Sequence, residues 1–115
     1  MNMDKKLMIL LIGIILISGC IGQEERPPEK PSDKDNAILA CEQECNAKLN
    51  ENIDLSKGPC LLNPIQDVPD WICDVAHNPR QTLDNQPENQ CSVFRDGKAH
   101  HFVEVDVNCE LIQVV

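Results

Sequence analysis

Cysteines dominate the chemistry available to this 115-residue chain. Seven are present, and six of them follow residue 40, at Cys41, Cys45, Cys60, Cys73, Cys91 and Cys109. An even number in a small exported domain is typical of disulfides, whereas zinc sites favour two close pairs or added histidines, and redox sites favour Cys-x-x-Cys. Only Cys41 and Cys45 are close together, and three residues separate them. Three disulfides are therefore predicted, with a zinc site and thiol redox chemistry as alternatives.

The pairing of these cysteines is only partly restricted by the sequence. Six cysteines allow fifteen pairings. Cys41 and Cys45 lie four apart in a segment with helical spacing, so their side chains point the same way and are poorly placed to bond each other. Each is therefore expected to bridge to a different later segment.

The remaining cysteine, Cys20, follows an apolar run. Leu7 to Ile17 are eleven apolar or glycine residues, preceded by two lysines and followed by Ser18-Gly19-Cys20. This run fits a signal peptide and is too short for a comfortable membrane span, although an uncleaved signal anchor is an alternative. Ile17-Ser18-Gly19-Cys20 resembles the lipobox of prokaryotic lipoprotein precursors, and the resemblance covers residues 1–20 only.

The lipoprotein resemblance implies a location. The signal peptide would be residues 1–19, and Cys20 would carry a diacylglyceryl group whose two chains anchor the protein on the extracytoplasmic face of the cell membrane. Residues 20–35 contain three prolines and many charges, which predicts a flexible tether. Residues 36–115 remain for one small domain stabilised by disulfides.

The charge of the chain restricts the classes of partner that it is expected to bind. The net charge is −9. Residues 1–19 contribute +1 through Lys5, Lys6 and Asp4, so the chain from Cys20 onward carries −10. Such acidity disfavours nucleic acid and adhesion to anionic lipid headgroups. No calcium-loop spacing, phosphate loop or hydrolase motif occurs, and no cofactor is predicted.

Two helices are expected in the first part of the domain. Ser32, Asp33 and Asp35 are candidate N-caps for a helix ending near Asn50. Its expected buried positions, at helical spacing, are Ile38, Cys41, Cys45 and Leu49. Residues 54–69 contain three prolines and are expected to be irregular. Residues 70–77 are expected to form a second, short helix, followed by a polar loop over 78–90.

The sequence of the last third of the domain predicts strands. Asp96-Gly97 lies between two β-rich runs, 91–95 and 98–106, which indicates a two-residue hairpin turn. Residues 110–115 predict a third strand. The expected fold is α+β, with an N-terminal helix and the second, short one on a C-terminal, three-stranded antiparallel meander.

Two polar clusters are candidate sites. Asp74, His77 and Arg80 are possible ligand contacts in a small polar pocket; alternatively, the cations simply suit the end of a helix. His100-His101 suggests a metal, but neighbouring strand residues point to opposite faces. His101 is expected half-buried with Val103 and Val105, and His100 exposed, so no metal site is predicted.

These observations favour a non-enzymatic binding or interaction module, held at the membrane by lipid on Cys20 and contacting an envelope protein, a peptide or a small ligand. A structural envelope lipoprotein is one alternative. A metal or thiol enzyme using Cys41, Cys45 and His77 is another.

Overall fold

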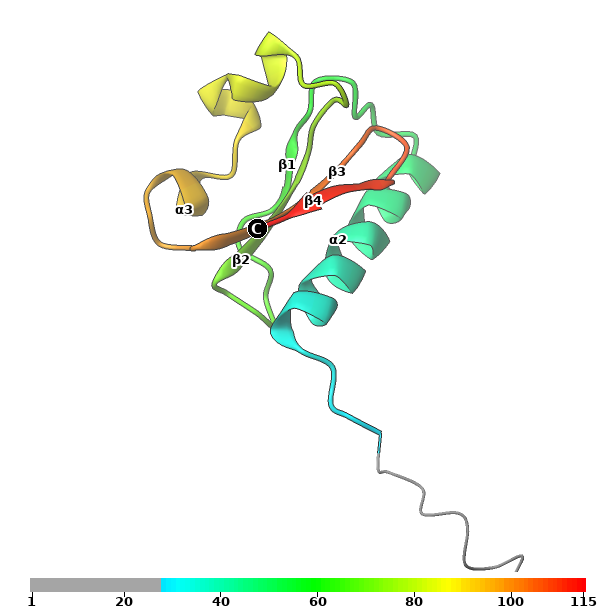
Figure 1. Cartoon of the computed structure of the whole chain (residues 1–115). Coiled ribbons are helices and arrows are strands. Elements are labelled where there is room, and N and C mark those ends of the chain that lie inside the picture. The colour runs from blue at the N-terminus through cyan, green and yellow to red at the C-terminus, as the bar shows by residue number, and fades with distance from the viewer. Residues whose placement is uncertain (1–27) are drawn as a thin grey trace, which may run out of the picture. The chain divides into compact units, whose positions relative to one another are not determined.

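Helix α2 (Asp33–Asn50) opens the compact unit Pro31–Val115 in the computed structural model, which describes residues 28–115 (Figure 1). The expected signal peptide, the lipid site at Cys20 and the tether as far as residue 27 lie outside the described residues. Within residues 28–115, no helix has both the length and the apolar character needed to cross a bilayer.

The start of α2 is set by a capping box. The Ser32 hydroxyl accepts a hydrogen bond from the Asp35 backbone N–H, and the Asp35 carboxylate accepts one from the Ser32 N–H. These bonds satisfy backbone donors that the first helical turn leaves unpaired. The predicted helix and its cap are confirmed.

Helix α2 presents a narrow stripe of small residues to the sheet. Ala37, Cys41 and Cys45 are buried at spacings of four, and Ile38 packs beside them. Leu49 was expected on this stripe, but it is 38% exposed because the stripe ends before the last turn.

The sheet has four strands in the order β1 (Cys60–Leu62), β2 (Trp71–Val75), β3 (His101–Val105) and β4 (Leu111–Val114). β1 pairs antiparallel with β2, β2 pairs parallel with β3, and β3 pairs antiparallel with β4. The α+β class and the last strand agree with the sequence. The three-stranded antiparallel meander does not, because the sheet is mixed and includes two strands from the middle of the chain.

The short helix expected over residues 70–77 is instead β2, a central strand. Trp71 and Val75 lie four apart, a spacing that also places them on one face of a five-residue strand. Trp71, Ile72, Cys73 and Val75 are buried, which requires cover on both faces of the strand. Its parallel partner β3 lies 30 residues further along the chain, in a register of Trp71 with His101, so no local signal marks the pairing.

The hairpin expected around Asp96-Gly97 is also wrong. Residues Ser92–Arg95 form a short helix, α3, and Gly97 ends it with a φ of +75°. Glycine adopts this left-handed conformation readily, so Asp-Gly serves a helix end as well as a hairpin. Asn63 holds the start of α3, since its side chain accepts from Val93 N–H at 3.0 Å and donates to the Ser92 hydroxyl at 2.9 Å.

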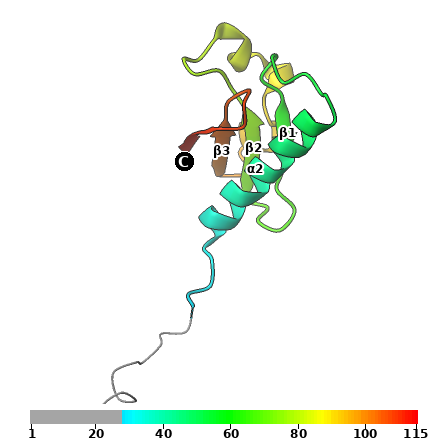
Figure 2. The ribbon, with the colours of Figure 1, turned by 90° about the vertical axis from the view of Figure 1, so that its right-hand side faces the viewer.

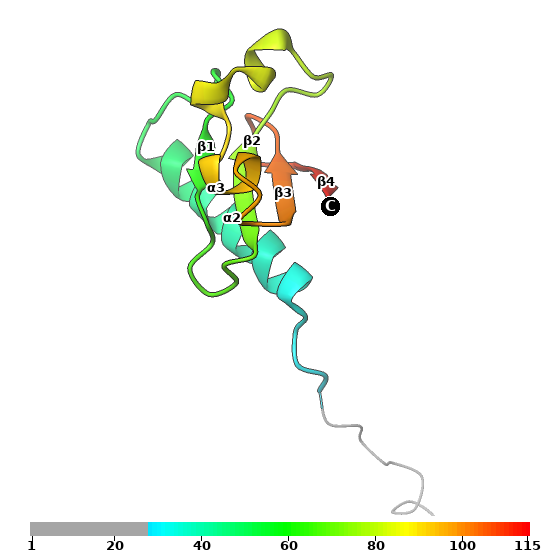
Figure 3. The same cartoon turned by 90° about the vertical axis from the view of Figure 1, so that its left-hand side faces the viewer.

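The connection from β2 to β3 lies over the face of the sheet opposite α2. It contains the 3₁₀ turns η1 (Thr82–Asn85) and η2 (Pro87–Asn89) and then α3. A parallel pair needs such a crossover. Figure 2 shows α2 in front of the strands, and Figure 3, from the opposite side, shows α3 in front of them.

Three disulfides join these layers, as the even number of cysteines predicts. Cys41–Cys73 and Cys45–Cys109 attach α2 to the sheet and to the turn before β4, and Cys60–Cys91 attaches the start of α3 to β1. Cys41 and Cys45 bridge different later segments, which confirms the expectation from their helical spacing.

Candidate functional site

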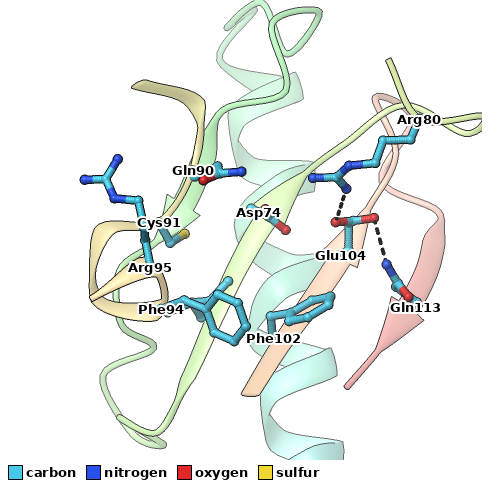
Figure 4. Close-up of a pocket in the computed structure, with 10 residues that line it drawn as sticks. Asp74, Arg80, Gln90, Cys91, Phe94, Arg95, Phe102, Glu104 and Gln113 are labelled. Atoms are coloured by element: carbon cyan, nitrogen blue, oxygen red, sulfur yellow. Dashed lines mark hydrogen bonds and ion pairs between the residues drawn. The ribbon is translucent and has the colours of Figure 1, made fainter. Parts of the chain in front are cut away.

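A pocket of about 540 Å³ opens on the sheet face opposite α2 (Figure 4). Strand alternation builds its floor, because Ile72 and Asp74 from β2 and Phe102 and Glu104 from β3 all point away from α2. The crossover and α3 supply one wall, and β4 supplies Gln113. This volume is within the range of about 300–1,000 Å³ that small-molecule sites occupy.

One end of the pocket is apolar. The rings of Phe94 from α3 and Phe102 from β3 meet edge to face, with centroids 5.1 Å apart and an interplanar angle of 80°. Phe94 is 38% exposed, so part of its surface is open to a ligand. Figure 4 shows the two rings together at one end, Arg80 and Glu104 at the other, and Asp74 between them.

The opposite end contains an ion pair whose carboxylate is buried. Arg80 Nη1 donates to Glu104 Oε2 at 3.0 Å, and the Glu104 side chain is only 6% exposed. Gln113 Nε2 donates to the other carboxylate oxygen, Oε1, at 3.3 Å. Arg80 is itself held by Asn85 Oδ1 and by the backbone carbonyl of Asp84. Both oxygens of Glu104 therefore have protein donors, and the guanidinium is fixed in place.

Asp74 lies beside this ion pair with one oxygen unpaired. Its Oδ1 is buried and has no hydrogen-bond partner among the described residues. Burial raises the pKa of Asp74 to about 7, with a further contribution from the Glu104 charge, a smaller one from Asp84, and opposition from Arg80. Asp74 therefore changes its charge near neutral pH, unlike an ordinary aspartate.

His77 does not line this pocket. Its Nδ1 lies 2.9 Å from Asp84 Oδ1, and the Asp84 side chain is 1% exposed. Burial by itself raises the pKa of Asp84, but hydrogen bonds from the Gln81 and His77 backbones and from the His77 ring outweigh it and lower the pKa overall. His77 thus belongs to the network that holds the loop after β2, and no helix ends there.

The two adjacent histidines converge on a carboxylate. His100 Nδ1 lies 2.6 Å from Asp70 Oδ1, and His101 Nε2 lies 3.5 Å from Asp70 Oδ2. His101 also stacks on Trp71, with centroids 4.5 Å apart. The expected half-burial of His101 and exposure of His100 are found. Their convergence was not expected; it occurs because His100 precedes β3 and is free of its alternation.

Chemistry based on Cys41, Cys45 and His77 has no support in this geometry. Both sulfurs are in disulfides, so neither provides a thiolate, and the His77 ring contacts Asp84. In the part of the chain from residue 28 onward, no group of three or more His, Cys, Asp or Glu side chains is arranged to hold a metal ion.

Comparison of the chain with protein-family models, curated proteins and solved structures gives no match. The candidate site therefore depends on its own geometry. Of the three residues singled out in the sequence, the pocket brings together Asp74 and Arg80 and excludes His77.

Glu104 and Gln113 were not among the site residues predicted from the sequence. A charged residue inside the apolar run 101–105 was the available signal, because a strand that buries both faces seldom contains a glutamate without a partner.

Proposed function

We propose that this protein is a lipid-anchored, extracytoplasmic binding module that takes a small organic ligand in the pocket between the sheet and the crossover. The lipobox resemblance supports the location, since it covers the residues that peptidase and acyl transfer require. Three disulfides support it too, because such bonds persist in oxidising compartments.

The observation that carries the proposal is the unpaired oxygen of Asp74. Most buried polar atoms in proteins have a partner, and leaving one without costs about 1–3 kcal/mol. Here the Asp74 side chain lines a cavity, beside a carboxylate whose own oxygens are both satisfied. A ligand that donates a hydrogen bond to Asp74 completes the set, which gives the pocket a use that a purely structural protein lacks.

The pocket also has the composition of a binding site. Two aromatic rings provide apolar contact area, and a few fixed polar groups at the other end provide orientation. Small-molecule sites generally combine these two features. The Cys60–Cys91 bridge, with Cys91 in the wall, holds α3 over the floor without a ligand.

Binding is tested with a fragment library added to the ¹⁵N-labelled lipoprotein in detergent micelles, with backbone amide shifts as the readout. We expect hits whose shifts cluster in β2, β3 and α3. Phe102→Ala should weaken them about tenfold through lost ring contact. Leu39→Ala, at a 56%-exposed position on α2, is the control and should leave them unchanged. A library without any hit on this face contradicts the binding function.

The anchor is tested separately at Cys20. We expect Cys20→Ser to remain an unprocessed precursor that incorporates no radiolabelled fatty acid, whereas the native chain is labelled and shortened. Label on the Cys20→Ser protein would refute lipid attachment at this residue.

A further inference from the structure

The Asp74 carboxylate in the pocket lacks a hydrogen-bond donor. Glu104 accepts from Arg80 and from Gln113, and Arg80 donates to three acceptors. Among the buried side-chain nitrogen and oxygen atoms of residues 28–115, only Asp74 Oδ1 lacks a hydrogen-bond partner. A ligand that brought a carboxylate or phosphate to this point would place its charge against Asp74 and Glu104 instead of satisfying either.

The charges at the polar end favour a cation. Asp74, when ionised, and Glu104 together carry two negative charges, and Arg80 balances one of them. One positive charge on the ligand neutralises the remainder, and ion pairing is stronger there than in water because the surroundings are of low dielectric. Arg95 also lines the pocket, but it is exposed and donates to the Pro87 carbonyl outside this group.

The size and the apolar end favour an organic cation over a metal ion. About 540 Å³ is far more than a bare ion fills, and the described residues provide no metal-ligand cluster. Phe94 and Phe102 offer ring surface beyond Asp74, which suits the hydrocarbon part of the same molecule.

We propose that the ligand class is a small protonated amine with an apolar body, its ammonium group against Asp74 and its apolar part against Phe94 and Phe102. This inference rests on the proposed binding function and specifies which ligands the pocket selects. An ammonium group supplies the missing donors and the missing charge together.

The geometry also gives the pH dependence of binding. The groups facing Asp74 are Glu104 on β3 together with Arg80 and Asp84 from the loop, and their net effect with burial raises its pKa to about 7. The protonated carboxyl neither balances an ammonium charge nor offers both oxygens. Amine affinity is therefore high above pH 7 and falls as Asp74 takes up its proton below pH 7.

The test compares three probes that share a phenyl ring on a short chain: 2-phenylethylamine, 2-phenylethanol and 3-phenylpropanoate. Each is titrated into the full lipoprotein in micelles at pH 8 and pH 5.5, with amide shifts of β2 and β3 as the readout. At pH 8 we expect the amine to bind about tenfold more tightly than the alcohol, since a hydrogen bond to a charged group contributes that much. The acid should bind most weakly.

Variants and pH then assign the preference to one carboxylate. Asp74→Asn should reduce the preference for amine over alcohol to about twofold or less, whereas Asp67→Asn, an exposed aspartate outside the pocket, should preserve it. Moving from pH 8 to pH 5.5 should weaken amine binding about tenfold or more and leave alcohol binding unchanged.

The outcomes separate this inference from the proposed function. Equal binding of all three probes at the pocket, tightest binding of the acid, or a preference that survives Asp74→Asn would overturn the amine assignment and leave a binding module standing. Absence of amine binding would overturn the assignment as well. The fragment screen, which contains no bias toward amines, decides the binding function itself.

Discussion

The two faces of the sheet are built from the same two central strands but differ in composition. On the α2 side, Trp71, Cys73, Val75, Val103 and Val105 are buried in a continuous apolar core. On the other side, the intervening positions place Asp74 and Glu104 beside a cavity. Because strand residues alternate between faces, neighbouring positions in the sequence can serve stability and binding separately.

The disulfides follow the same division. Two of them lie on the α2 side, where Cys41, Cys45 and Cys73 are fully buried. The third, Cys60–Cys91, lies on the pocket side, and Cys60 is only half-buried. The α2 face is thus cross-linked and buried. The pocket face depends on one bridge and on hydrogen bonds from loops.

The test with the largest expected effect removes one bridge from each face of the sheet, in two separate variants. Cys41–Cys73 and Cys60–Cys91 span 32 and 31 residues. Removing either bridge frees the unfolded chain to the same degree, which should lower the free energy of unfolding by about 4 kcal/mol. Replacing Cys41 and Cys73 by Ala should cost about 1 kcal/mol more than replacing Cys60 and Cys91, because it also leaves a void in the core. Urea unfolding of the two double variants measures the difference.

Binding should show the opposite order. The Cys60→Ala/Cys91→Ala variant releases the start of α3, so fragments that contact Phe94 should lose affinity, while the variant lacking Cys41–Cys73 should bind normally as long as it stays folded. Equal loss of binding in both variants would mean that the faces are not separable.

A second test concerns Asp74, which is expected to lower stability at neutral pH. Its pKa is about 7 in the folded chain against about 3.8 in the unfolded chain. Asp74 therefore costs no stability below about pH 3.8, where it is protonated in both states. The free energy of unfolding falls as the pH rises from about 3.8 to 7, and the loss is complete above pH 7. Asp74→Asn should match the native chain near pH 4 and exceed its free energy of unfolding by about 1–3 kcal/mol at pH 8.

The control for this pH profile is Asp67→Asn, which removes an exposed carboxylate from the loop between β1 and β2. It should shift stability by less than about 0.5 kcal/mol at either pH. A stability gain at pH 8 accompanied by lost amine selectivity is the pattern of a group retained for binding at the expense of stability. A loss of stability in Asp74→Asn at pH 8 would show that the carboxylate is well solvated or paired.

The features predicted correctly from sequence are those with local signals. Ser32 and the spacing of Cys41 and Cys45 mark helix α2, and the run before Val115 marks β4. The identity of β2 was missed because its burial comes from a parallel partner about 30 residues away. Residues Ser92–Arg95 have strand-like types, but the Cys60–Cys91 bridge and Asn63 hold them as a helix.

The site, like the fold, could be predicted from the sequence only in part. Asp74 and Arg80 were predicted with His77 as a polar cluster at the end of an expected helix, and both line the pocket although that helix is a strand. Glu104 and Gln113 join them only through the order of the strands, which no local pattern reveals. His77 lies close to Asp74 in sequence, but it follows the strand and reaches Asp84 instead.

The test with the smallest expected effect makes the same change, serine to alanine, once on each face of the sheet. Ser32→Ala removes the cap of α2 and should lower the free energy of unfolding by about 1 kcal/mol. Ser92→Ala removes the hydroxyl that accepts from Asn63 and should cost about 0.5–1 kcal/mol. Since α3 contributes Phe94 to the pocket, only Ser92→Ala should also weaken fragment binding, by about twofold to threefold. Thermal unfolding together with amide-shift titration measures both quantities on the same samples. If Ser32→Ala weakened binding as much as Ser92→Ala, the pocket would depend on the stability of the whole unit, and the division between the two faces would not hold.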